Sequence, residues 1–274
     1  MASNLTPSPT ELNQYCSVAM EAAQLACNAI LAIYERFDPA NTQYKQDASP
    51  LTEADLAADK IIADYLAAAF PHIPLISEET SDPAYAFRQD WPLSWLVDPL
   101  DGTKEFLRKN GEFTVNIALL QGSKVIAGIV AAPVRDELFW AGKGLGAWRI
   151  HAGETQQLHV SNFSRLDSGL RIVASRSHRD AETEAFIASH KEPVIRAMGS
   201  SLKIVLLAAG DADIYPRFAP TMEWDTAAAQ IILEEAGGLL VEAETAKPLR
   251  YNKPDRHNPF FIAYGGCSDC LTRS

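Results

Sequence analysis

The sequence predicts an α/β (α+β) protein in two parts, with an antiparallel sheet in the N-terminal part and an α/β C-terminal part. Residues 113–148 alternate β-branched and aromatic residues with turn signals, which is typical of an antiparallel meander. Residues 170–265 instead alternate short apolar strands with helical segments, the pattern of a layered α/β unit. A chain of 274 residues that is 47% apolar can form two modest domains with packed cores. We expect these domains to be residues 1–162 and residues 163–274.

Two long helices are predicted near the start of the chain. Apolar residues recur at helical spacing over residues 9–37, with Thr10 as the expected cap. A second helix is expected over residues 52–70, because Thr52 can act as its N-cap and acidic residues fill its first turn. Short buried strands are then expected at residues 74–77 and 94–97.

The C-terminal part is predicted to alternate strands with helices. The expected strands are residues 170–175, 193–198, 213–218, 239–243 and 259–265. The expected helices are residues 180–189, 200–209 and 224–236.

The charge balance argues against nucleic acid or an anionic membrane as the main partner. The formal net charge is −11, from 24 Lys and Arg against 35 Asp and Glu, whereas nucleic acids and anionic lipids attract clustered cations. The N-terminus has no basic segment followed by an apolar core, and no run approaches the roughly 18 apolar residues of a membrane span. We therefore expect a cytoplasmic protein without a transmembrane segment.

The four cysteines are too few and too unevenly placed for a disulfide framework. Cys16 and Cys27 lie on the first predicted helix, and Cys267 and Cys270 lie near the end of the chain. The C-S-D-C segment has the spacing of a zinc or redox site, but no second Cys/His pair follows it. We expect ordinary reduced surface thiols there.

Four carboxylates stand at the ends of predicted elements. They are Glu78, Asp98, Asp101 and Asp225. One acid in such a position is commonly a cap. Asp98 and Asp101, however, bracket a restrained Pro-Leu dipeptide, and like charges held so close favour proton uptake unless a cation lies between them. Because hard divalent cations prefer oxygen ligands, the four acids together indicate a Mg²⁺ site.

Gly102 and Thr103 follow these acids directly, in the segment WLVDPLDGTKEF. If a short helix begins there, its free N–H groups can bind an anion, and the glycine lets a phosphate approach the main chain. Thr103 is expected either to cap this helix or to orient a water molecule. Metal-binding carboxylates beside an anion site indicate a phosphoryl hydrolase.

Two segments resemble motifs of the inositol monophosphatase superfamily. WLVDPLDGTKEF resembles its D-P-(I/L)-D-G-T motif, and WDTAAAQIILEEAGG resembles its W-D-x-A-(A/G) motif. The motifs occur in the family's order, after a pair of glutamates, and the resemblance spans essentially the whole chain. It implies a layered α/β/α/β/α sandwich, in agreement with the two-part pattern.

The resemblance also implies a role for each acid. The implied ligands are Glu78, Asp98 and the carbonyl group of Leu100 for a first Mg²⁺, and Asp98, Asp101 and Asp225 for a second. Thr103 and Glu78 would activate the attacking water. Asp55 matches an acid that serves as a proton acceptor or contacts a third metal, so two or three Mg²⁺ ions are expected.

Within the superfamily, several segments are similar to the 3'(2'),5'-bisphosphate nucleotidase branch. They are LDGTKEF, VASRSH, GSSLK and YPRFAPTMEWD. The implied substrate-binding residues are Gly102, Thr103, His178, Ser200, Lys203, Arg217 and Asp225. Lys203 and Arg217 are cations that a second phosphate would require, and Ser200 would begin a helix whose N-terminus binds an anion. Lys104 and Glu105 mark the branch, but a helix-surface ion pair explains them equally well.

The expected activity is Mg²⁺-dependent removal of the 3'-phosphate of adenosine 3',5'-bisphosphate, and of the same position in its sulfated form, in support of sulfate assimilation. One alternative is an inositol-phosphate or sugar-phosphate phosphatase with the same metals. Another is a nucleotide or cation sensor that has lost turnover, although a sensor has no need of a water-activating threonine. Monomer and homodimer both stay open, as does peripheral attachment to the inner face of the membrane, which some relatives show.

Overall fold

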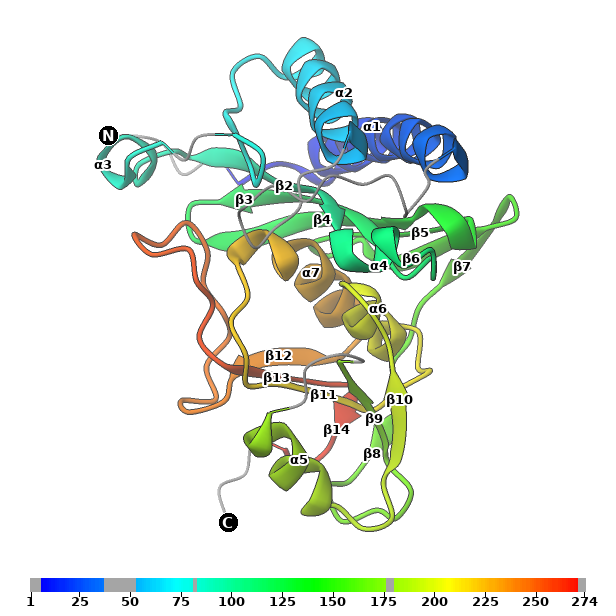
Figure 1. Cartoon of the computed structure of the whole chain (residues 1–274). Helices are drawn as coiled ribbons and strands as arrows, with labels where there is room; N and C mark the ends of the chain where they lie inside the picture. The colour runs from blue at the N-terminus through cyan, green and yellow to red at the C-terminus, as the bar shows by residue number, and fades with distance from the viewer. Residues whose placement is uncertain (1–5, 37–52, 81–82, 176–179, 271–274) are drawn as a thin grey trace.

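Five layers of secondary structure are stacked in the computed structural model, which describes residues 6–36, 53–80, 83–175 and 180–270 (Figure 1). Helices form the two outer layers and the middle layer, and each pair of helical layers encloses one sheet. The helices concerned are α1 (Pro9–Arg36) and α2 (Glu53–Ala69) outside, α6 (Leu202–Ala208) and α7 (Ala227–Glu235) in the middle, and α5 (Ala181–Ala188) on the far side. This arrangement confirms the predicted α/β/α/β/α sandwich.

The first sheet has seven strands in sequence order. They are β1 (Leu75–Ser77), β2 (Leu93–Asp101), β3 (Thr114–Gln121), β4 (Lys124–Ala132), β5 (Glu137–Gly142), β6 (Gly146–His151) and β7 (Glu154–Gln157). The β1 strand runs parallel to β2, and every later pair is antiparallel. The predicted meander is thus confirmed, with β7 as a strand that the pattern did not predict.

The second sheet has five strands in the order β10-β9-β11-β13-β12. Their bounds are β9 (Arg171–Ala174), β10 (Val194–Ala197), β11 (Ile214–Arg217), β12 (Leu239–Glu242) and β13 (Phe261–Tyr264). Two short strands, β8 (Asn162–Phe163) and β14 (Gly266–Cys267), pair beside it. All strands and helices predicted for this part are present, although α6 and α7 begin two or three residues later than expected. The division into domains at residue 162 stays a prediction.

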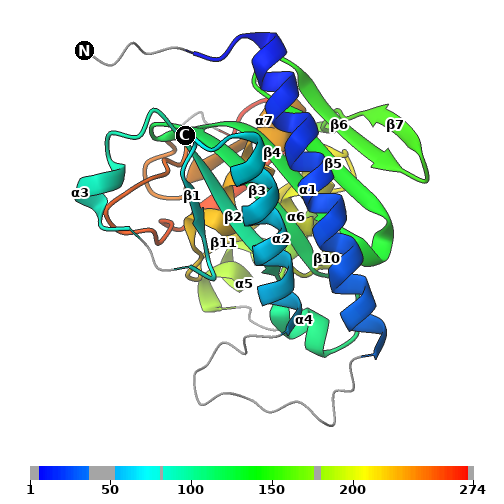
Figure 2. The ribbon, with the colours of Figure 1, turned by 90° about the horizontal axis from the view of Figure 1, so that it is seen from above.

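Helix α1 lies beside α2 across the first sheet (Figure 2). Its N-cap is Ser8 rather than the predicted Thr10, because the Ser8 hydroxyl accepts from the Glu11 N–H (3.3 Å) while the Glu11 carboxylate accepts from the Ser8 N–H (2.8 Å). The other predicted cap, Thr52, lies outside the described residues. An 18-residue window of α1 has a mean hydropathy of 1.5, so by length and composition alone this helix could cross a membrane, but its apolar face is part of the core beneath α1 and α2.

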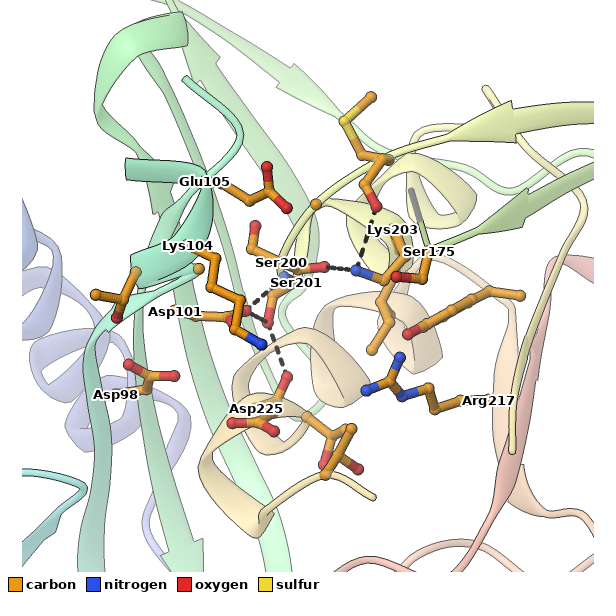
Figure 3. Close-up of a pocket in the computed structure, with 18 of the residues that line it drawn as sticks. Asp98, Asp101, Lys104, Glu105, Ser175, Ser200, Ser201, Lys203, Arg217 and Asp225 are labelled. Atoms are coloured by element: carbon orange, nitrogen blue, oxygen red, sulfur yellow. Dashed lines mark hydrogen bonds between the residues drawn. The ribbon is translucent and has the colours of Figure 1, made fainter. Parts of the chain in front are cut away.

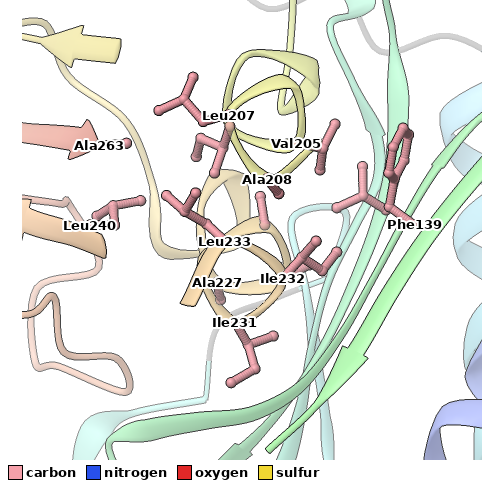
Figure 4. Packing of buried hydrophobic residues seen from close by; sticks show 14 of the residues in the cluster. Phe139, Val205, Leu207, Ala208, Ala227, Ile231, Ile232, Leu233, Leu240 and Ala263 are labelled. Carbon is pink, nitrogen blue, oxygen red and sulfur yellow. The ribbon is translucent and has the colours of Figure 1, made fainter. Parts of the chain in front are cut away.

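Helix α7 packs directly on β4, with no side chain between the two backbones at Gly128. A Cβ atom at this position would lie 2.3 Å from the Ala228 carbonyl oxygen, so any larger residue would push the helix off the sheet. Small and branched side chains of α6 and α7 fill the space between the two sheets, from Phe139 on one side to Leu240 on the other (Figure 4). The N-terminal end of α7 is therefore held firmly against the first sheet.

The cysteines differ partly from expectation. Cys16 and Cys27 are free and buried, and burial raises the pKa of both thiols to about 12. Cys267 and Cys270 form a disulfide, so the prediction of free surface thiols is wrong for this pair. The three-residue separation brings their Cα atoms within 5.6 Å, a distance that a disulfide spans readily.

Candidate active site

Strand β2 carries two of the predicted site carboxylates, Asp98 and Asp101. The predicted strand ended at Val97, but β2 continues to Asp101, with a β-bulge between Asp98 and Asp101 where the Pro-Leu dipeptide lies. The bulge turns the Leu100 N–H toward Asp98 Oδ1, at 3.0 Å. Asp98 is 1% exposed, so it is an acid inside the sheet rather than at its solvent edge.

A cavity of about 490 Å³ opens at this bulge, between the first sheet and the C-terminal part (Figure 3). The predicted site residues that line it are Glu78, Asp98, Leu100, Asp101, Gly102, Thr103, Ser200, Lys203, Arg217 and Asp225. Glu78 follows β1, and its N–H donates to the Val97 carbonyl of β2 at 3.1 Å. Asp225 reaches the same cavity from the 3₁₀ turn η3 (Glu223–Asp225), directly before α7. Asp55, in the first turn of α2, is not among the lining residues but is buried (4% exposed).

The carboxylates of this cavity disfavour one another's charge. Burial raises the pKa of Asp98 well above its usual value, and the charges of Asp101, Glu78 and Asp225 raise it further. Partial removal of the carboxyl groups from water and the charge of Asp101 likewise raise the pKa of Glu78 to about 7 and that of Asp225 to about 8, although Glu78 as a whole residue is exposed. The charge of Asp55 adds to the effect on Asp98 and Glu78. The charges of these acids thus outweigh the effect of the cations that line the same cavity.

The donor set fits a divalent cation. Among the described residues, no Lys, Arg or His forms an ion pair with the four cavity carboxylates. Their oxygen atoms are hard ligands on a rigid strand and a rigid turn, which suits Mg²⁺ better than a soft metal. A bound cation would remove the mutual repulsion that raises these pKa values.

Ser201 joins the two motifs that the sequence separates by more than a hundred residues. Its N–H and its hydroxyl lie 2.6 and 2.9 Å from Asp101 Oδ2, and the hydroxyl also lies 2.7 Å from the Asp225 carbonyl oxygen. Asn116 completes the link, because its amide donates to Ser201 Oγ at 3.0 Å. Sequence reasoning missed this role for both residues. The available signal was Thr114 and Asn116, two polar residues on one face of an otherwise apolar strand.

Gly102 is the N-cap of the short helix α4 (Thr103–Leu107), with a φ of 99° that favours glycine. Thr103 is therefore the first helical residue, and the prediction that it caps the helix is wrong. Its hydroxyl lies 3.5 Å from the Leu100 carbonyl oxygen and lines the cavity beside Asp101. The alternative prediction, that Thr103 orients a water molecule, stays open.

The opposite wall carries the predicted cations. Lys203 is buried in α6, and its ammonium group donates to the Ser200 carbonyl (2.6 Å) and weakly to that of Met198 (3.5 Å). Burial lowers the pKa of Lys203 to about 8, although Asp101 raises it in part. Arg217, on β11, donates to the Pro220 carbonyl at 3.1 Å, while its buried Nε has no hydrogen-bond partner among the described residues.

Three details of the substrate-side prediction change. Helix α6 begins at Leu202 rather than at Ser200, and the Ser201 N–H donates to Asp101 and is not available to an anion, while anion binding at Ser200 stays a prediction. Lys104 and Glu105 form no ion pair with each other, because Glu105 is buried and pairs with Arg108. His178 lies outside the described residues.

The comparisons with known proteins agree with this geometry. The model of the inositol monophosphatase family matches residues 11–259. The chain belongs to this family. The 3'(2'),5'-bisphosphate nucleotidase CysQ of Escherichia coli (strain K12) is 42% identical over 251 residues, covering 91% of this chain and 98% of that protein.

Solved structures support the same placement. The crystal structure of CysQ from Bacteroides thetaiotaomicron matches with a TM-score of 0.82 and 41% identity over 92% of this chain and 97% of that one. The inositol monophosphatase from Anabaena (Nostoc) sp. PCC 7120 matches with a TM-score of 0.72 and 25% identity over 95% of this chain and 94% of that one. Membership implies a metal-dependent phosphatase. Of the two structures, the nucleotidase-type relative is the more similar in sequence and in fold.

Proposed function

We propose that this protein is a Mg²⁺-dependent 3'(2'),5'-bisphosphate nucleotidase that converts adenosine 3',5'-bisphosphate to AMP and phosphate. The observation that carries the proposal is the two-sided cavity, in which unpaired carboxylates face Lys203 and Arg217. One side suits metal ions and the phosphate that is cleaved. The other suits the second phosphate, which a monophosphate substrate does not have.

The metal ligands of the proposal come from both parts of the chain. Glu78, Asp98 and the Leu100 carbonyl would hold one Mg²⁺, and Asp98, Asp101 and Asp225 a second. The ions would supply charge neutralisation for the phosphate and a more acidic water. Asp98 belongs to both sets and lies deepest, while Ser201 fixes Asp101 and the Asp225 backbone relative to each other.

The residues around the water have complementary tasks. The Thr103 hydroxyl would orient the water, since it can donate its proton to the Leu100 carbonyl, 3.5 Å away, and keep its lone pairs available. Glu78 would accept the proton released by the water. The buried charge of Asp55 raises the proton affinity of Glu78, which strengthens Glu78 as an acceptor. A third metal ion near Asp55 is part of the same proposal.

On the cationic wall, Arg217 would hold the second phosphate through the donors that the Pro220 carbonyl leaves unused. Lys203 would add a charge from the floor of the cavity. Ser200 and Gly102 expose main chain to the cavity, where a substrate phosphate can approach closely. His178 belongs to the proposal on the resemblance alone.

A substrate panel tests the proposal. Release of inorganic phosphate is measured with adenosine 3',5'-bisphosphate, its 5'-phosphosulfate analogue, inositol 1-phosphate and fructose 1,6-bisphosphate, each with Mg²⁺ and with EDTA. We expect the highest kcat/KM for the two nucleotides and no turnover in EDTA. Preference for inositol 1-phosphate or the sugar bisphosphate would favour the alternative phosphatase. Nucleotide binding without phosphate release would favour the sensor.

A further inference from the structure

Lys104 lines the cavity but has no role in the proposed function, because it is neither a proposed metal ligand nor part of the wall that carries Lys203 and Arg217. It is the second residue of α4, directly after Thr103, and its side chain is exposed and lines the cavity. In Figure 3 it extends from the wall that carries Asp98 and Asp101 toward the interior, whereas Arg217 enters from the other side.

Lys104 also differs from its neighbours in having no contact that holds it elsewhere. Within the described part of the chain, its ammonium group forms no hydrogen bond or ion pair. Directly after this helix, Arg108 pairs with Glu105, and the following Lys109 donates to the Tyr34 carbonyl and lies over the Tyr34 ring. Lys203, across the cavity, is held by two backbone carbonyls. Lys104 is thus free to follow a ligand.

Electrostatics place that ligand on the acidic side. A phosphate that binds beside Asp98, Asp101 and Asp225 brings roughly 1.5 to 2 further negative charges into a site already rich in carboxylates. Divalent cations offset much of this charge, and an ammonium group from the same wall of the cavity offsets more. Lys203 and Arg217 lie on the other wall, so among the described cavity residues Lys104 is the lysine adjacent to the water-activating threonine.

We propose that Lys104 is a further substrate-binding residue, which contacts the phosphate that is cleaved rather than the second phosphate. The inference rests on the proposed function for the position of the two phosphates. Ordering a free lysine side chain costs conformational entropy, so the net effect of the contact on binding is moderate.

The kinetic test compares four variants on two substrates, adenosine 3',5'-bisphosphate and a simple phosphate monoester. Lys104→Ala should lower kcat/KM about 10-fold to 100-fold on both substrates, and Lys104→Arg should recover part of the loss, because the charge is kept. Arg217→Ala should affect the bisphosphate far more than the monoester. Lys124→Ala, which removes an exposed lysine outside the cavity, is the charge-matched control and should match the wild type on both.

A binding experiment gives a readout that does not depend on turnover. The affinity for inorganic phosphate in the presence of Mg²⁺, measured by calorimetry, should fall about 10-fold in Lys104→Ala and stay unchanged in Lys124→Ala. Equal affinity in both variants, or a loss confined to bisphosphates, would overturn the assignment. If the wild type hydrolyses another phosphate ester but not the nucleotide, the proposed function fails, and the same variants on that ester still decide the role of Lys104.

Discussion

Asp98, within β2, and Asp213, directly before β11, are both buried carboxylates, yet their surroundings are opposite. Asp213 is 5% exposed and lies directly before β11, where Arg171 donates to it through its side chain (2.5 and 3.0 Å) and its backbone N–H (2.7 Å). Ser161 donates a further hydrogen bond at 2.6 Å. Asp98 accepts a backbone N–H but, within the described residues, has no cationic partner.

The two pKa shifts follow from this difference. Burial works to raise the pKa of Asp213, but the hydrogen bonds from Arg171 and Ser161 outweigh it, and the pKa is lowered. At Asp98 burial is reinforced by neighbouring acids, and the pKa is raised. At Asp213, where the buried acid is structural, the chain thus supplies its own cation, Arg171. At Asp98, where the described residues supply no cation, the carboxylate remains available to bind a cation from solution.

The largest expected effect is at the acid without a cation. Asp98→Asn removes a ligand shared by both proposed metal ions, so kcat should fall more than about 100-fold, beyond the roughly 10-fold to 100-fold typical of outer partners of a metal site. The same change removes a buried, uncompensated charge, and the melting temperature in EDTA should rise. Near-normal phosphate release in this variant would contradict the two-metal scheme.

Asp213→Asn should give the reverse result. Loss of the charged partner of Arg171 should lower the free energy of unfolding by about 2 kcal/mol, since hydrogen bonds to charged groups are lost in a buried position. Catalysis of the folded fraction should stay close to that of the wild type. Urea denaturation measures the loss of stability, and initial rates measure catalysis. A variant that is stable but inactive would contradict the assignment of Asp213 as a structural acid.

A third experiment sharpens the contrast between the walls of the cavity. Arg217→Ala should reduce kcat/KM about 10-fold to 100-fold for adenosine 3',5'-bisphosphate and far less for a monoester, because only the former has a phosphate on that wall. Lys203→Ala should show the same selectivity, although its burial makes a loss of stability part of the result. Equal losses on both substrates would mean that these cations do not set specificity.

The smallest effect concerns pH. The pKa of Glu78 is about 7 and that of Asp225 about 8 in the metal-free fold, against usual values of 4.5 and 3.8. At pH values between the usual pKa of each acid and its raised pKa in the fold, the folded chain binds more protons than the unfolded chain. The free energy of unfolding therefore falls as pH rises through this interval. In EDTA the melting temperature should drop by several degrees between pH 5 and pH 8, at about 2 to 4 °C per kcal/mol for a chain of this size.

Magnesium should reverse this trend. Its stabilising effect should be larger at pH 8 than at pH 5, where protons compete with the metal for the same oxygen atoms. Thermal unfolding with and without Mg²⁺ at both pH values measures it. A melting temperature that is independent of pH in EDTA would show that the acids do not repel one another as described.

Much of the fold could be predicted from the sequence, because strand alternation and helical spacing are local signals. Local signals also failed in specific places. Strand β2 seemed to end at Val97, since a buried aspartate in a strand makes sense only once its neighbours in space are known. The start of α6 was misplaced because Ser200 adopts a positive φ of 45° and Ser201 turns its N–H to Asp101.

The site shows the same limit. The acids could be predicted because each lies in or beside a short contiguous motif. The structure brings Glu78, Asp98, Asp101 and Asp225 to one cavity. The link between them through Ser201 could not be predicted, because it joins Asp101, 100 residues before Ser201, to Asp225, 24 residues after it, and no contiguous motif contains all three. The role of Lys104 stayed open in the sequence, because a helix-surface ion pair with Glu105 explained both residues, and only the three-dimensional arrangement shows that Glu105 is buried and Lys104 exposed.

The missing side chain at Gly128 has a consequence for how the enzyme handles its substrate. Since α7 touches the β4 backbone there, the turn that holds Asp225 cannot swing away without breaking a dry interface between layers. Opening and closing of the catalytic centre would then come from short loops and side chains, not from a hinge between halves. Gly128→Ala should push α7 away from β4 and so displace Asp225, and the first measurable effect should be a weaker affinity for magnesium.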